Sequence, residues 1–110
     1  MARYLQLAKY TPQACAAVFD GGWVPRRKVL EEYVTGLGGT IVDMYAVAND
    51  EWDFAVIIDA DDFGPAKNAA HLLRVYGAGT IERSVLLSLA ALEDVDAARS
   101  SLPGYTPPGR

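Results

Sequence analysis

Alternation of apolar and polar residues predicts four β-strands in this chain. Apolar side chains recur at every second position, which is the period of a strand with one buried face. These segments cover residues 3–10, about 40–47, about 51–59 and about 80–90. The pattern therefore indicates a protein whose framework is a small β-sheet.

Helical periodicity fills the two longer intervals between the strands. Thr11 is suited to be an N-cap with Pro12 at the first helical position, and this short helix is expected to end at Gly21. Further helices are expected over residues 25–36 and 65–76. The apolar stripe of the middle helix consists of Leu30, Tyr33, Val34 and Leu37.

The helix expected over residues 65–76 has an apolar and a polar side. Its apolar stripe consists of Ala66, Ala69, Ala70, Leu73 and Tyr76. Lys67, His71 and Arg74 lie opposite and are expected to face water, which makes His71 a solvated surface histidine.

The order strand, helix, strand, strand, helix, strand predicts an α+β protein with a ferredoxin-like βαββαβ fold. Such a fold has a four-stranded antiparallel sheet with two helices on one face. We expect this domain to span residues 1–92. Residues 93–110 are expected to form a C-terminal extension, a short helix followed by a Pro- and Gly-rich tail. The tail is either a disordered end or an arm packed on a dimer.

The second and third strands are expected to form a hairpin. Placing Val47 opposite Glu51 leaves residues 48–50 as a three-residue loop in which Asn49 or Asp50 takes the left-handed conformation. This register sets Tyr45 opposite Asp53.

Alternation along the strands also predicts two different faces of the sheet. The face expected under the helices carries Leu5, Leu7, Val42, Met44, Ala46, Trp52, Phe54, Val56, Ile58, Ile81, Val85, Leu87 and Leu89. The other face is half apolar and is expected to carry Tyr4, Gln6, Ala8, Tyr10, Ile41, Asp43, Tyr45, Val47, Asp53, Ala55, Ile57, Asp59, Glu82, Ser84, Leu86 and Ser88. Sheltering about 400 Å² of it per chain contributes roughly 10 kcal/mol before association costs. We therefore expect a homodimer, a dimeric α/β barrel with these mixed faces turned inward.

Composition narrows the classes of function. The chain has 110 residues, 51% of them hydrophobic, which suits one domain with a modest core. A net charge of −4 argues against a nucleic-acid partner. The chain shows neither a membrane-spanning run nor a signal peptide, so we expect a soluble cytoplasmic protein. The single cysteine, Cys15, cannot form an internal disulfide and is expected to be a small buried apolar residue.

The inward face of the expected barrel supplies the candidate site. Tyr45 facing Asp53 is the candidate catalytic pair, because a phenol beside a carboxylate in a dry cavity can bind a polar group or move a proton. The alternative is a cross-strand hydrogen bond with no chemical role. Gln6, Asp43 and Ser84, with Glu82 nearby, are expected to line the same ligand-binding space.

No metal or cofactor is expected. A metal site needs converging ligands, and the sequence has no Cys/His cluster at a recognised spacing. Gly21-Gly22 followed by Arg26, Arg27 and Lys28 lacks a phosphate-loop signature, so a solvated basic turn is the expected structure.

Several stretches closely resemble the GYD domain family of small dimeric α/β-barrel proteins. The resemblance lies in LQLAKYTPQA, VLEEYVTGLGGTIVDMYAV, EWDFAVIIDADD and GTIERSVLLSLAAL, and covers about residues 3–92. The family's Gly-Tyr-Asp motif falls on Glu51-Trp52-Asp53, which keeps only the aspartate. The resemblance implies a ferredoxin-like protomer that dimerises through its open sheet face.

The resemblance implies little about activity, since most members of this family have no assigned reaction, and related barrels include haem-dependent enzymes and cofactor-free ones. We expect the barrel to bind a small, partly apolar molecule. The alternatives are a cofactor-independent monooxygenase or isomerase of a small aromatic substrate, and a structural or interaction protein with a filled barrel. Whether the protein is an enzyme stays open, because a fold does not determine a function.

Overall fold

The structure is a computed structural model that describes residues 2–109. In chain order its elements are β1 (Ala2–Tyr10), α1 (Pro12–Gly21), α2 (Trp23–Gly36), β2 (Gly39–Ala46), β3 (Phe54–Ala60), α3 (Pro65–Gly77), β4 (Ile81–Leu89) and α4 (Leu92–Arg99). The strands form one sheet in the order β2-β3-β1-β4, and each neighbouring pair is antiparallel. The predicted α+β, ferredoxin-like fold is confirmed.

Local sequence signals place the helix ends. The Thr11 hydroxyl accepts a hydrogen bond from the Ala14 N–H at 3.1 Å, and Pro12 occupies the first turn, as predicted. Gly22, with φ of 88°, separates α1 from α2, and Gly38, also with φ of 88°, turns the chain from α2 into β2. Both bends favour glycine because an L side chain rarely adopts this conformation.

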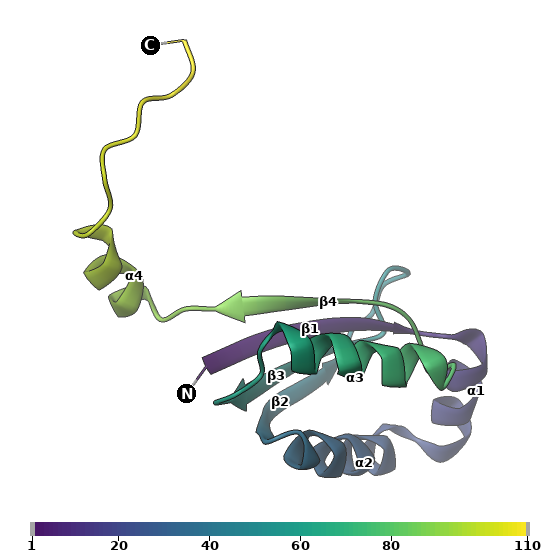
Figure 1. Cartoon of the computed structure of the whole chain (residues 1–110). Helices are drawn as coiled ribbons and strands as arrows, with labels where there is room; N and C mark the ends of the chain where they lie inside the picture. Colours follow the sequence, from purple (N-terminus) through teal and green to yellow (C-terminus); the bar gives the residue numbers. More distant parts are fainter. Residues whose placement is uncertain (1, 110) are drawn as a thin grey trace.

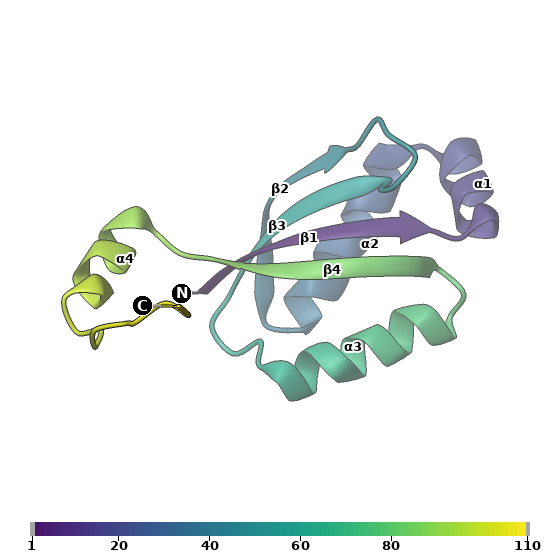
Figure 2. The same cartoon turned by 90° about the horizontal axis from the view of Figure 1, so that it is seen from above.

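Helices cover only one side of the sheet. Figure 1 shows α1, α2 and α3 on one side, with no element on the other. In Figure 2 the strands lie in front of α2, and α3 runs alongside β4. The buried cluster lies between the sheet and the helices and consists of Ala8, Tyr10, Phe54, Val56 and Ile81. We call the bare side the open face.

The predicted orientation of β1 is wrong. Opposed residues share a face, and Gln6 and Ala8 lie opposite Val56 and Phe54, so Gln6, Ala8 and Tyr10 point toward the helices. Tyr10 is only 2% exposed because its hydroxyl accepts a hydrogen bond from Arg26. Alternation alone could not choose the face, because both sides of β1 are partly apolar.

The predicted orientation of β4 is wrong in the same way, whereas β3 turns Phe54 and Val56 toward the helices, as predicted. Leu86 of β4 lies opposite Gln6 and faces the helices, whereas Leu87 lies opposite Leu5 and faces away from them. In β2 the register shifts between Ile41 and Asp43, which puts Ile41 on the helix side. The apolar residues of the open face are therefore Leu5, Leu7, Ala55, Ile57, Val85, Leu87 and Leu89.

The predicted hairpin register is also wrong. Tyr45 lies opposite Ala55, not Asp53, and β3 begins at Phe54. The loop is longer than three residues, because the Val47 N–H bonds the Asp53 carbonyl at 2.9 Å. Within it the Asn49 side chain accepts from two backbone N–H groups, and no non-glycine residue in the described range has positive φ.

The orientation predicted for α3 is inverted. Leu73 is 78% exposed, and Ala66 and Ala70 also face outward. Lys67 instead donates to the Leu37 carbonyl at 3.0 Å, and His71 is hydrogen-bonded to α2. These polar side chains turn inward because the end of α2 offers them partners.

The C-terminal part of the chain projects from the sheet. Figure 1 shows β4 running into α4, followed by an extended segment. Leu92, Leu102 and Tyr105 are 71–80% exposed. Across residues 2–109, no helix combines the length and the apolar character needed to span a membrane.

Candidate functional site

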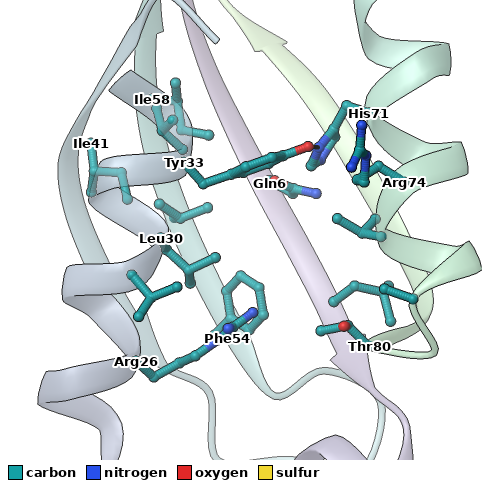
Figure 3. Close-up of a pocket in the computed structure, with 16 residues that line it drawn as sticks. Gln6, Arg26, Leu30, Tyr33, Ile41, Phe54, Ile58, His71, Arg74 and Thr80 are labelled. Carbon is teal, nitrogen blue, oxygen red and sulfur yellow. Dashed lines mark hydrogen bonds between the residues drawn. The ribbon is translucent and has the colours of Figure 1, made fainter. Parts of the chain in front are cut away.

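A cleft lies between the helix side of the sheet and helices α2 and α3. Its volume is about 200 Å³. We call it the α2–α3 cleft. Apolar walls dominate it: Val29, Leu30, Val34, Ile41, Phe54, Val56, Ile58, Val75 and Ile81. Figure 3 shows Leu30 and Tyr33 entering from α2, His71 and Arg74 from α3, and Gln6 from the strand between them. The space is therefore a chamber with polar groups at particular points.

A hydrogen bond between Tyr33 and His71 spans the cleft. The Tyr33 Oη and His71 Nδ1 atoms are 2.8 Å apart, and the ring centroids are 5.4 Å apart. Burial lowers the pKa of His71 and raises the pKa of Tyr33, although Arg74 opposes the shift of Tyr33. The imidazole is thus held neutral, with the tyrosine protonated.

This pair has a simple chemical capacity. Among residues 2–109, His71 makes no other side-chain hydrogen bond, so its Nε2 atom is available to a bound molecule. Nε2 accepts a hydrogen bond or a proton when Nδ1 carries the ring proton, and donates a hydrogen bond when the Tyr33 hydroxyl donates to Nδ1. Phe63 packs edge-on against the imidazole, with centroids 6.2 Å apart, and fixes the ring.

Two arginines contribute positive charge to the cleft. Arg26, in the first turns of α2, donates from Nε to the Tyr10 hydroxyl at 3.0 Å and lies 5.6 Å from the centre of that ring. The pKa of Tyr10 is raised mainly by burial, which Arg26 opposes. Arg74 lies near Tyr33 on the opposite helix, as Figure 3 shows.

The predicted site residues do not assemble. The Tyr45 hydroxyl donates to Asp43 at 2.5 Å on the open face, so Tyr45 pairs with its strand neighbour and not with Asp53. The pKa of Tyr45 is raised by this bond to Asp43. Ser84 lies 3.3 Å from the Tyr76 hydroxyl on the helix side of β4. Of the five ligand-binding candidates, Gln6 alone lines the α2–α3 cleft.

The Asp53 side chain contacts residues at the end of β1 and the start of α1. Its carboxylate accepts from the Tyr10 N–H at 2.8 Å and lies 3.4 Å from the Lys9 ammonium. The Cys15 thiol is 3.6 Å away, and its pKa is raised by burial first and then by Asp53. This cysteine is half-buried and not fully buried as predicted, and its raised pKa keeps the thiol protonated.

Sequence reasoning missed the residues that line the cleft. His71 and Arg26 were expected in solvent but are half-buried. Arg74 is exposed, as expected, and also borders the cleft. Tyr33 was correctly assigned to the inward stripe of its helix. This position was the one sequence signal that pointed to the cleft. No group of three His, Cys, Asp or Glu side chains in residues 2–109 is arranged to hold a metal ion.

Comparison with known families fits this architecture. The family model of the GYD domain matches residues 4–98, from β1 into α4. The chain belongs to the GYD domain family. A search of functionally described proteins found no match to this GYD domain protein.

Proposed function

We propose that this GYD domain protein binds a small, largely apolar molecule in the α2–α3 cleft. The observation that carries the proposal is the cleft itself, about 200 Å³ of space walled by aliphatic side chains and Phe54. Apolar cavities of about 150 Å³ accept benzene, whereas drug-sized ligands occupy about 300 Å³ or more. A ligand with a single ring and one short substituent therefore fits best.

Benzyl alcohol is a suitable probe, followed by ¹⁵N–¹H NMR. We expect saturable shifts of amides around the cleft and a Kd on the order of 1 mM, as suits so small a ligand. Ala78→Phe puts a ring at the mouth of the cleft and should weaken binding at least ten-fold. Ala78 has ordinary helical backbone angles, so the substitution does not strain the chain.

Two control variants isolate the cleft. Ala70→Phe adds the same ring on the outer side of α3, and Asp53→Asn alters the candidate carboxylate beside α1. Both should bind benzyl alcohol like the wild type. Equal affinity of Ala78→Phe and wild type, or shifts that never saturate, would remove the cleft as a binding site.

We also propose that the open face is covered by a second copy of this chain. Its seven apolar side chains form one surface, and Leu87 and Leu89 remain 44% and 41% exposed. Monomeric proteins rarely expose such a contiguous apolar surface to solvent. Burying about 400 Å² per chain contributes roughly 10 kcal/mol, which is within the range of association costs.

The C-terminal segment supplies the additional contact that such a dimer needs. Stable interfaces bury about 800 Å² per partner, roughly twice what the open face offers. Four apolar side chains are 51–80% exposed on an arm that projects beyond the end of the sheet in Figure 1: Leu92, Val95, Leu102 and Tyr105. Sedimentation velocity should give a dimer at micromolar concentration, and deleting residues 100–110 should raise its dissociation constant. A monomer at that concentration would refute the dimer.

A further inference from the structure

We infer that the ligand of the α2–α3 cleft is an anion, a small monocyclic carboxylate whose negative group lies at Arg74 and Gln6. The inference rests on the proposed function of this cleft and adds the charge class of its ligand. Its basis is the distribution of charge around the cavity.

The α2–α3 cleft is positive in an acidic protein. The chain has 14 acidic and 10 basic residues, yet none of the 16 residues lining the cleft is Asp or Glu. Two of them, Arg26 and Arg74, are arginines. Arg26 is half-buried, so its guanidinium attracts an anion more strongly than one in water does, whereas Arg74 is exposed and its attraction is partly screened by solvent.

Neither arginine is neutralised by a side chain. In the described part of the chain, salt bridges join Arg3 to Asp59, Lys9 to Asp53 and Arg27 to Glu31. Arg26 uses Nε on Tyr10 and keeps its terminal nitrogens free, and Arg74 makes no side-chain hydrogen bond within residues 2–109. Arginine presents two parallel donors that match the two oxygens of a carboxylate.

Polar side chains gather where Arg74 enters. Figure 3 shows Gln6, His71 and Arg74 near the Tyr33 hydroxyl, with Leu30 and Phe54 farther along the cleft. The side-chain amide of Gln6 makes no hydrogen bond to another described residue. Its NH₂ group can donate to an oxygen of the ligand. A ligand whose ring lies between Leu30 and Phe54 contacts the apolar walls with that ring. Its carboxylate then contacts the polar groups at Arg74.

The test compares two probes of similar size, benzoate and benzyl alcohol, by NMR titration. For the wild type we expect benzoate to bind about ten-fold more tightly, because hydrogen bonds to charged groups are roughly twice as strong as neutral ones. Its affinity should fall as NaCl is raised, whereas that of benzyl alcohol should not. The salt series needs no variant.

Arg74→Gln should remove most of the preference for benzoate over benzyl alcohol, so that the ratio of the two affinities falls from about ten toward one. Arg99→Gln is the matched control, since Arg99 also lies in the last turn of a helix but on α4, outside the cleft. Melting curves of both variants check that the fold is intact.

The outcomes separate this inference from the proposed function. Equal affinity for both probes with no effect of Arg74→Gln overturns the anion site and leaves the cleft a neutral binding site. An equal loss in Arg99→Gln also overturns it, because the attraction would then be a property of the whole surface. Failure of both probes to bind the wild type overturns both proposals.

Discussion

The two faces of the sheet differ in how their apolar side chains are covered. The helix-covered face contains the buried cluster around Tyr10 and Phe54, and each polar group there has a partner or borders the cleft. The open face presents aliphatic side chains with nothing above them in a single chain. One face is covered by its own helices, and we propose that a second copy of the chain covers the other.

The two proposals give the faces separate roles. The proposed ligand lies within one protomer, between sheet and helices, and the proposed dimer forms through the open face. In this arrangement Asp43 and Tyr45, which bond each other on the open face, belong to the proposed interface and not to the ligand site. Ligand binding and dimer formation can therefore be disrupted independently.

The largest effect should come from the helix-covered face. Phe54 is 4% exposed and packs against Tyr10 and Trp23, with ring centroids 5.1 and 6.1 Å away. Phe54→Ala should lower the free energy of unfolding by about 3–5 kcal/mol, measured by urea denaturation at fixed protein concentration. Phe19→Ala, at a side chain 89% exposed, should change it by less than about 0.5 kcal/mol. Similar losses in both variants would contradict the packing described for this face.

The next effect should come from the open face. Leu87→Glu puts a carboxylate from each chain into the proposed interface, where it loses hydration without a partner. We expect the dissociation constant of the dimer to rise at least about 100-fold, or about 2.7 kcal/mol, in sedimentation equilibrium. Benzyl alcohol binding in the cleft should persist.

Leu73→Glu is the control for that variant. Leu73 is 78% exposed on the outer side of α3, away from the open face. Its dimer should dissociate like that of the wild type. If Leu73→Glu breaks the dimer and Leu87→Glu does not, the second copy docks on α3 instead.

The smallest effect should be a change in pH dependence. Burial holds the pKa of His71 below its usual 6.5, so the unfolded chain takes up this proton at a higher pH than the folded chain does. Stability contributed by neutral His71 is therefore present above about pH 6.5 and is lost as the pH falls toward the folded pKa.

His71→Gln should flatten this part of the profile. Between pH 7.5 and 5 the wild type should lose more stability than the variant, measured by denaturant midpoints at each pH. Lys28→Gln, an exposed cation on α2, serves as the control and should follow the wild type. Parallel profiles for wild type and His71→Gln would show that the imidazole is as hydrated as in the unfolded chain.

Local patterns predicted most of the fold. The strands near residues 3–10 and 80–90, the Thr11 cap, the helix stripe of Leu30 and Val34, and the order of elements agree with the structure. These features depend on backbone preference and on side-chain period, which act over a few residues. The family match over residues 4–98 agrees with the resemblance seen in the same segments.

The sequence by itself determined which residues share a face in β1 and β3 and which face of β3 turns inward, and only the tertiary structure decided which face of β1, β4 and α3 does so. The alternation of side chains along a strand places Tyr4, Gln6, Ala8 and Tyr10 on one side. It does not determine which side of the strand meets the helices. That choice came from distant partners: Arg26 for the Tyr10 hydroxyl, Tyr33 for His71, and the Leu37 carbonyl for Lys67. A polar side chain can turn inward when another element provides its hydrogen-bond partner. The local sequence pattern does not show where that other element will lie.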